Sequence, residues 1–295
     1  GAAEDTRFAH NDEIYFSIAS ILKYVPYCGT IYIITDHQQP SFVGEFEAQG
    51  LCRSGQIQVV DHQEIFRNYQ QYLPTFNSLS IESMLWNIKG ISNHFIYLND
   101  DFFFNQQSDL SDFLIDGQMV IYGHWQATLI KKMKYIFRKF LQQNFGMVAE
   151  AKYSTAQMLS ADRVGMTRYY EIHHRPHILS RDLLSTYFKN NKELLEQQIQ
   201  FKFRNIDQLL PVGLSNHLAI QSDQAILKDD IDIAYLKDGR DLEKFILALS
   251  NSEIKFGCIQ SLDQLESLAE GRIRAALIQK FTGFLPSQIQ PTTVV

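Results

Sequence analysis

The sequence predicts an α/β fold with a mainly parallel, Rossmann-like sheet and a largely helical insertion. Helical patterns and short apolar strands alternate over roughly the first 105 residues, and such alternation is typical of parallel βαβ units. Residues from about 123 to 220 lack that alternation and have mostly helical patterns. We therefore expect residues 1–122 and 223–295 to form one α/β core, with residues 123–222 inserted as a mostly helical block.

Composition and charge indicate a globular protein. The chain has 295 residues, of which 45% are hydrophobic and 20% charged, unlike fibrous or disordered chains. Its net charge of −6 argues against nucleic-acid binding as the main function, because such proteins usually carry net positive charge. The three cysteines are far apart and form no zinc or disulfide pattern, which favours a reducing compartment. No apolar run approaches the ~18–20 residues of a membrane span.

Local patterns predict the individual elements. Apolar residues recur every three or four positions over residues 13–24, which predicts a helix with Asn11 or Asp12 as its N-cap. Runs of β-branched and apolar residues predict strands, and residues 153–170 show no clear pattern. The other elements expected are strands over residues 30–35, 57–62, 95–98, 119–122, 231–235 and 255–259, and helices over residues 80–86, 127–145, 181–200, 206–210, 214–219, 242–249 and 262–281.

Three predicted strands run directly into polar residues. Ligands of parallel sheets bind beyond the carboxyl ends of the strands, so these polar groups are expected to border a binding site. The three strand ends are Thr35-Asp36, Asp61-His62 and Asn99-Asp100-Asp101.

The pair Asp100-Asp101 is the leading candidate within these strand ends. A plain turn is one interpretation, because Asn and Asp favour turns. Adjacent carboxylates repel each other, however, unless a cation or a set of hydrogen-bond donors compensates them. Hard oxygen ligands suit Mg²⁺ or Mn²⁺, which bridges phosphate oxygens. The pattern therefore also indicates a site for a divalent metal and a phosphorylated ligand.

A second group of polar residues lies in the predicted helical block. His173, His174 and His177 fall within five positions. Three interpretations are open. The histidines are surface residues, or they are zinc ligands, although no Cys or neighbouring carboxylate completes the ligand set. In the third interpretation, one of them is a general base. Arg204, beside two aromatic residues, is either a surface residue with a packed stem or a bidentate phosphate ligand.

The helix predicted over residues 127–145 carries a basic cluster between Lys131 and Lys139. Such a cluster is usually a solvated face, and the alternative is a surface for an anionic polymer or a membrane. The sequence contains no G-x-x-x-x-G-K-[ST], G-x-G-x-x-G or G-x-S-x-G motif. This argues against the commonest nucleotide-binding loops and against a serine-hydrolase elbow.

Several segments together resemble the Stealth family of sugar-phosphate transferases, which includes bacterial capsule polymerases and the lysosomal-enzyme GlcNAc-1-phosphotransferase. The match to the second conserved block of that family covers about a hundred residues in order, and shorter matches to the third and fourth blocks follow. The second block is carried by Arg7-Phe8, Asn11-Asp12-Glu13-Ile14, Ile31 to Asp36, Leu73-Pro74-Thr75-Phe76-Asn77-Ser78, Glu82 and Phe95 to Asp101; the third by His174-x-Pro176-His177, Arg181 and Phe203-Arg204-x-x-Asp207; and the fourth by Phe256-x-Cys258-Ile259.

The resemblance implies a glycosyltransferase-A-like fold and a phosphotransfer reaction. A sugar 1-phosphate would pass from a UDP-sugar to a hydroxyl of a growing capsular polysaccharide, forming a phosphodiester and releasing UMP. Mg²⁺ or Mn²⁺ is the expected cofactor. The expected partners are the UDP-sugar donor and the polysaccharide acceptor, with no nucleic acid. The expected location is the cytoplasmic side of the bacterial inner membrane, with peripheral association to that membrane or to the capsule export machinery.

The resemblance also implies roles for individual residues. Asp100 and Asp101 would bind the metal and the diphosphate, Arg204 would hold the transferring phosphate, and His174 would be the base for the acceptor hydroxyl. His177 is the weaker candidate for that base and is otherwise expected in the donor site. The remaining donor-site residues would be Arg7, Asn11, Glu13, Asn77, Glu82 and Asn99.

The chain departs from the family pattern in two places. Gln260-Ser261 stands where Asn-Asp usually follows Cys-Ile, so one carboxylate is missing. The first conserved block, expected before Arg7, is absent, as in an N-terminally trimmed chain. Two alternatives therefore stand beside the phosphotransferase. One is an ordinary glycosyltransferase that attacks the anomeric carbon and releases UDP, and the other is a carbohydrate-binding relative without catalysis.

Overall fold

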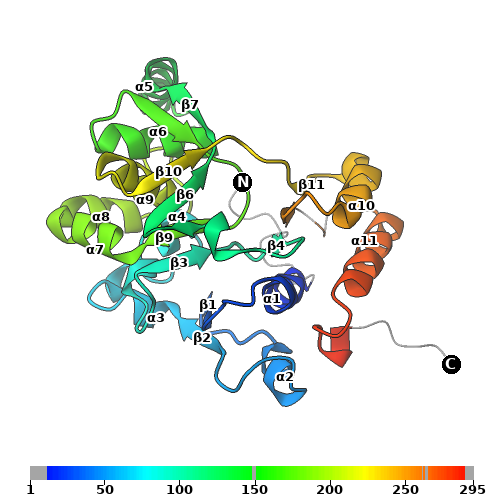
Figure 1. Cartoon of the computed structure of the whole chain (residues 1–295). Coiled ribbons are helices and arrows are strands. Elements are labelled where there is room, and N and C mark those ends of the chain that lie inside the picture. The colour runs from blue at the N-terminus through cyan, green and yellow to red at the C-terminus, as the bar shows by residue number, and fades with distance from the viewer. Residues whose placement is uncertain (1–11, 148–150, 261, 263–264, 290–295) are drawn as a thin grey trace.

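The computed structural model describes residues 12–147, 151–260, 262 and 265–289. These residues form a mixed α/β structure in which small sheets lie among many helices (Figure 1). The α-helices are α1 (Glu13–Tyr24), α2 (Val43–Ala48), α3 (His62–Ile65), α4 (Ser78–Glu82), α5 (Thr128–Phe145), α6 (Tyr153–Arg163), α7 (Arg181–Asn190), α8 (Lys192–Ile199), α9 (Pro211–Gln221), α10 (Leu242–Ser250) and α11 (Ser267–Lys280). The strands are β1 (Ile31–Thr35), β2 (Ile57–Asp61), β3 (His94–Tyr97), β4 (Phe102–Phe104), β5 (Leu114–Ile115), β6 (Gln118–Tyr122), β7 (His124–Ala127), β8 (Arg168–Glu171), β9 (His177–Ser180), β10 (Ala225–Lys228), β11 (Ala234–Leu236) and β12 (Phe256–Ile259).

The N-terminal elements agree with the sequence patterns. Helix α1 has the expected bounds, and β1, β2 and β3 each begin and end within one residue of the predicted strands. Strands β1 and β2 pair in parallel, with Ile31 opposite Ile57 and Thr35 opposite Asp61. Because the two strands run in the same direction, their polar carboxyl ends adjoin, as predicted.

The third predicted strand has a different partner from the one expected. Strand β3 is antiparallel to β9, with His94 opposite Ser180 and Tyr97 opposite His177. Across the described residues, parallel pairs (β1–β2, β6–β10, β11–β12) and antiparallel pairs (β3–β9, β4–β12, β5–β6, β7–β8) occur together. The α/β class is confirmed, whereas a mainly parallel sheet is not observed. Strand β9 has four residues, all buried, directly before α7, so no alternation marks it as a strand.

The described part of residues 123–222 contains strands as well as helices. Strands β7, β8 and β9 lie among helices α5 to α9. The helix predicted over residues 181–200 divides at Asn191 into α7 and α8, and residues 206–210 form no helix. Strands β6 and β10, which flank this segment in sequence, pair in parallel. The chain therefore leaves and rejoins the rest of the fold at neighbouring positions, while the proposed domain division itself stays a prediction.

Strand β4 follows Asp101 directly and lies between two hydrophobic cores. It pairs with β12, which also pairs with β11. Phe103 packs edge-to-face on Phe245 and Phe281, with ring centres 6.2 Å apart in each pair. Phe104 belongs to the other core, because alternate residues of a strand face opposite sides. Both cores therefore fix the position of the turn that precedes β4.

Helix α5 turns its apolar side outward, and its inner side is basic. Lysines on the inner side form ion pairs: Lys131–Glu171, Lys132–Asp162 and Lys139–Asp207. These three members of the basic cluster therefore face acidic groups of the protein, whereas Lys134 is exposed. None of the helices in the described ranges has the length and apolar character needed to cross a membrane. The outward apolar side chains are 52–67% exposed and comprise Leu129, Ile130, Met133, Ile136, Phe137 and Phe140.

The substitution Gly257→Ala tests the packing of β4. Gly257 lies opposite Phe103 in the β4–β12 pair, and a Cβ atom at this position would lie 2.0 Å from the Phe103 ring. Because that ring is held by Phe245 and Phe281, it has little room to shift. We expect the free energy of unfolding to fall by about 1–3 kcal/mol, as measured by urea denaturation.

The matched control is Gly44→Ala in helix α2. A Cβ atom at Gly44 would meet no atom within 4 Å, and alanine has the higher helix propensity. This variant should be as stable as the parent or slightly more stable. If the two variants had equal stability, the close approach of β12 to Phe103 would be refuted.

Candidate active site

A cavity of about 1750 Å³ lies beside helix α1, strands β1 and β3, and helix α4. The ends of β1 and β2 contribute Asp36 and His62, whose Oδ1 and Nδ1 atoms are 3.9 Å apart. The polar ends of this pair of strands therefore border a cavity, and their role in ligand binding stays a prediction. Further polar lining comes from Glu82, Asn99, Asp100, Asp101, Arg204 and Gln260.

Asp101 is a buried carboxyl group at the wall of this cavity. Burial, followed by the charge of Asp100, raises the pKa of Asp101 to about 7. Its Oδ2 atom accepts a long hydrogen bond of 3.5 Å from the Cys258 thiol, whereas its Oδ1 atom has no hydrogen-bond partner among the described residues. Its backbone carbonyl accepts a 2.8 Å hydrogen bond from the Ile259 N–H group. The backbone is thus fixed to β12, while one carboxylate oxygen is left for a ligand.

Glu82 is a second buried carboxyl group in the same lining. Burial raises the pKa of Glu82 to about 7, and its hydrogen bond with Tyr97 and the charge of Arg204 act in the opposite direction. Its Oε2 atom also lacks a hydrogen-bond partner within the described ranges. The Tyr97 hydroxyl donates a hydrogen bond to Asn99 Oδ1. The cavity therefore has two carboxyl groups whose pKa values are raised by burial, and a bound cation or hydrogen-bond donor would stabilise their charged forms.

Arg204 reaches the cavity from the loop after α8. Its guanidinium donates a 2.8 Å hydrogen bond to the Ser78 hydroxyl at the start of α4. The loop is held by side chains of the preceding segment: the Phe201 carbonyl accepts hydrogen bonds from Asn77 at 3.0 Å and from Ser80 at 3.1 Å. In addition, the rings of Phe76 and Phe203 stack with centres 5.8 Å apart. Residues 75–80 therefore determine where Arg204 lies.

His174 lies in the loop between β8 and β9, among aromatic rings. It stacks on Tyr153 at 4.9 Å and on Tyr235 at 6.2 Å between ring centres, and the Phe102 ring lies 6.2 Å away. Burial, followed by the charges of His173 and Arg204, lowers the pKa of His174. Its imidazole is therefore neutral near pH 7, the form that accepts a proton.

Residues predicted from two distant parts of the sequence lie at or beside this cavity: Asp101 from a strand end, and Arg204 and His174 from the predicted helical block. Glu82, Asp101 and Arg204 line the same cavity, and the His174 ring packs against Phe102, the residue after Asp101. The Arg204 charge acts to lower the pKa values of Glu82, Asp101 and His174. Tyr235, stacked on His174, has its pKa raised to about 12 by burial and then by the charges of Cys258 and Asp101. Segments about a hundred residues apart in sequence thus form one site, whose catalytic roles remain predictions.

The other predicted donor-site residues divide into two groups. Glu13 and Asn99 line the cavity. Asn77 is fully buried, and its amide also donates a 2.8 Å hydrogen bond to Gln208, so its contacts position the Arg204 loop. His177 is buried on β9, where burial and then the Arg175 charge lower the pKa of His177 well below its usual range. Arg7 and Asn11 lie outside the described residues.

Sequence patterns did not identify Tyr153, Tyr235 or Gln260 as part of the site. Tyr153 begins α6 in a segment without clear periodicity, and Tyr235 lies in a three-residue strand. The Tyr235 hydroxyl donates a 2.6 Å hydrogen bond to Gln260 Oε1. The residue that departs from the family pattern therefore lies at the edge of the site, bound to a tyrosine that stacks on His174.

Comparison with known proteins agrees with this arrangement. Residues 7–121 match Stealth protein CR2, conserved region 2. An exopolysaccharide phosphotransferase of Streptomyces coelicolor is 30% identical over 236 residues, which are 80% of this chain and 23% of that protein. The capsular polysaccharide phosphotransferase LcbA of Neisseria meningitidis is 44% identical over 100 residues, which are 34% of this chain and 25% of that protein.

A third relative is a capsular polysaccharide phosphotransferase of Actinobacillus pleuropneumoniae, 39% identical over 112 residues. These cover 38% of this chain and 29% of that protein, so the chain spans about a quarter of the length of the three curated relatives. The matched region contains the cavity-lining residues from α1 through Asp101. The chain therefore belongs to the Stealth family and carries its conserved region 2.

Proposed function

We propose that this chain forms the catalytic site of an enzyme that transfers a sugar 1-phosphate from a UDP-sugar to a polysaccharide hydroxyl, with release of UMP. The observation that carries this proposal is that Asp101 and Arg204 line one cavity, while the His174 ring packs on Phe102, the residue after Asp101. The relatives named as phosphotransferases of capsular or extracellular polysaccharides support the same class of reaction. A polysaccharide acceptor and a nucleotide-sugar donor follow from that class.

The carboxylates fit the proposed Mg²⁺ or Mn²⁺. The buried Oδ1 atom of Asp101 has no hydrogen-bond partner in the described part of the chain, and hard oxygen ligands suit these ions. Asp100 and Asp101 would hold the metal, which when bound neutralises charge on phosphate oxygens. Because Asp101 retains its proton up to about pH 7, that proton must leave before the ion binds.

Arg204 and His174 supply the remaining functions of the proposed reaction. The guanidinium of Arg204 forms hydrogen bonds with the oxygens of the sugar-bearing phosphate and stabilises their charge. The acceptor hydroxyl oxygen attacks that phosphorus, and His174 takes the hydroxyl proton. The bond from phosphorus to the UMP oxygen breaks, and UMP leaves with the electron pair. Stacking between Tyr153 and Tyr235 fixes the His174 ring for this step.

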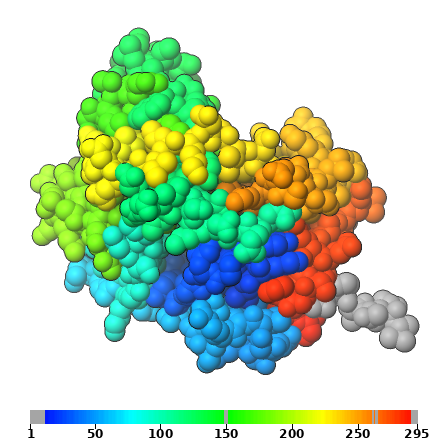
Figure 2. Space-filling model, in the orientation of Figure 1, coloured from blue at the N-terminus to red at the C-terminus, as the bar shows by residue number. Residues whose placement is uncertain are grey.

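Helix α5 supports the proposal that the enzyme associates peripherally with a membrane. Its outward apolar stripe covers most of an 18-residue helix, and this helix forms an outer edge of the molecule (Figure 2). Lys134 and Arg138 lie on the same helix beside the stripe. An apolar face bordered by cations is the pattern of helices that lie in the interface of an anionic membrane. The proposed location is the cytoplasmic side of the inner membrane.

Three substitutions test the catalytic proposal in the full-length protein that contains this chain. His174→Ala, Arg204→Ala and Asp101→Asn should each lower phosphotransfer by about 10²–10⁴-fold, because each removes a different function. The assay combines a panel of UDP-sugars, an acceptor oligosaccharide and Mg²⁺, and identifies the nucleotide product by mass. Arg240→Ala, at an exposed ion pair with Asp238, is the control. Release of UDP in place of UMP would favour the glycosyltransferase, and full activity of the three variants would refute the assignment.

The Asp101→Asn variant should also change how stability depends on pH. The raised pKa of about 7 means that the folded state binds more protons than the unfolded state between about pH 4 and pH 7. The contribution of Asp101 to stability is therefore lost as pH rises through that window. At pH 8 we expect the Asn variant to unfold roughly 2–4 °C above the parent, equivalent to about 1 kcal/mol, with a smaller difference at pH 5.

Asp238→Asn is the control for this measurement. Hydrogen bonds with Arg240 lower the pKa of the exposed Asp238 to about 2, so its replacement should bring no gain in thermal stability at pH 8. Scanning calorimetry at both pH values decides the outcome. An Asp101→Asn variant that is less stable than the parent at pH 8 would show that the buried carboxylate is compensated within the protein.

Vesicle binding tests the role of α5. The double substitution Ile136→Asp and Phe140→Asp places two charges in the apolar stripe and should lower binding to anionic phospholipid vesicles at least roughly tenfold. Leu247→Asp and Leu268→Asp, at leucines that are 73% and 79% exposed on other helices, form the control pair. Sedimentation measures the bound fraction. Equal binding of both double variants would exclude α5 as the lipid-binding surface.

A further inference from the structure

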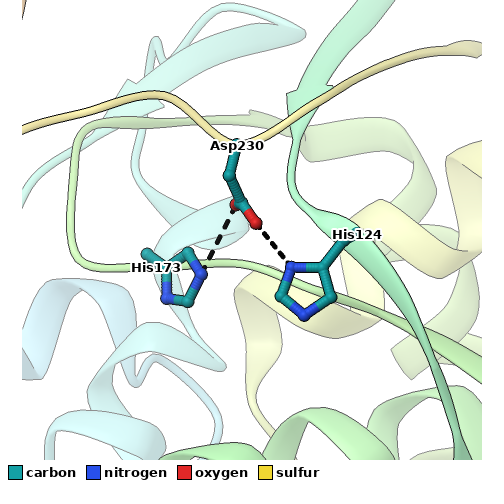
Figure 3. Close-up of side chains that lie close together, drawn as sticks. All are labelled: His124, His173 and Asp230. Atoms are coloured by element: carbon teal, nitrogen blue, oxygen red, sulfur yellow. Dashed lines mark hydrogen bonds and ion pairs between the residues drawn. The ribbon is translucent and has the colours of Figure 1, made fainter.

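We propose that His124, His173 and Asp230 form a binding site for a divalent transition-metal ion of the zinc class. The three side chains come from β7, from the loop between β8 and β9, and from the segment after β10. One ligand atom from each lies within 4.8 Å of the other two. Figure 3 shows the Asp230 carboxylate pointing between the two imidazole rings. This site lies outside the residues of the proposed phosphotransfer and does not depend on it.

Small side-chain movements would let these three groups coordinate one ion. Asp230 Oδ2 lies 2.5 Å from His124 Nδ1, and Asp230 Oδ1 lies 3.4 Å from His173 Nε2. Ligand atoms about 2.0–2.2 Å from a tetrahedral ion are separated by roughly 3.3 Å, so small side-chain movements would complete the geometry. Two imidazole nitrogens and one carboxylate favour Zn²⁺ or a similar ion over Mg²⁺, which prefers oxygen ligands. Such a set leaves a coordination position for water or another ligand.

A second observation supports the site. The other ring nitrogen of His124, Nε2, lies 2.9 Å from the Gln126 side-chain amide and 3.6 Å from Glu171 Oε2. Glu171 is itself held by the Lys131 ammonium at 3.3 Å and by the Tyr169 hydroxyl at 3.2 Å. Metal-binding histidines commonly direct their second nitrogen to a carboxylate, which fixes the ring orientation and the tautomer. Here the Gln126 amide is the nearest partner of that second nitrogen, and it holds the His124 ring with Nδ1 facing Asp230.

The position of the site indicates what a bound ion would do. Asp230 belongs to the segment that crosses from β10 to β11, between two parts of the molecule (Figure 1). His173 immediately precedes His174 in the loop before β9. An ion bound to all three side chains would tie this loop, strand β7 and the crossing segment together. The carboxylate of this site, Asp230, lies 57 positions after His173, so the sequence around the histidines did not reveal it.

Metal binding by the whole chain tests the proposal. The metal-free protein is titrated with Zn²⁺ in a calorimeter, and bound zinc is counted by mass spectrometry after dialysis. We expect one tightly bound equivalent, a higher melting temperature with Zn²⁺, and visible d–d absorption with Co²⁺. His124→Ala, His173→Ala and Asp230→Asn should each lose the bound equivalent.

Two controls distinguish this site from others. His37→Ala removes an exposed histidine that pairs with Asp61 and should retain the bound zinc. Asp101→Asn should also retain it, because Asp101 belongs to the other site. Circular dichroism confirms that each variant is folded, and Asp230→Asn preserves the shape of the side chain. The proposal is overturned if the parent binds no zinc, if binding survives all three ligand substitutions, or if Asp101→Asn abolishes it.

Discussion

The burial of Asp101 against strand β12 is the constraint on which the site depends. A carboxyl group in this position is costly as an anion, and the fold maintains it because β4, the next strand, is packed into both cores. The hydrogen bond from Ile259 to the Asp101 carbonyl leaves the backbone no freedom to turn outward. The protein thus holds an unsatisfied oxygen in place ahead of any ligand, as a preorganised binding site requires.

The Stealth motif segments are in contact with one another in this structure. Residues 75–80 belong to the matched region, and Arg204 belongs to a loop more than a hundred positions later. Hydrogen bonds from Asn77 and Ser80 and the stacking of Phe76 on Phe203 join the two segments. Asn77 and Ser80 of the earlier segment therefore hold the Arg204 guanidinium in position, whether or not they also contact a ligand.

The sequence predicted local elements better than their partners. Helix α1 and strands β1 to β3 were predicted almost to the residue, because their periodicity and β-branched runs are local properties. The antiparallel pairing of β3 with β9 was not predictable, because pairing depends on a distant four-residue strand without alternation. The outward apolar face of α5 also escaped prediction. Its periodicity defined an apolar and a basic face, and the side that meets the protein was decided by Glu171, Asp162 and Asp207.

The parallel pairing of β6 with β10 has a consequence for how the length of this chain can vary. The chain between these strands departs from and returns to adjacent positions, so changes in its length need not disturb the carboxylate side of the cavity. The segment between β6 and β10 contains His174 and Arg204, whereas Glu82 and Asp101 lie outside it. Recombination at this junction would exchange the segment that carries His174 and Arg204 as a unit, while the rest of the cavity stayed constant.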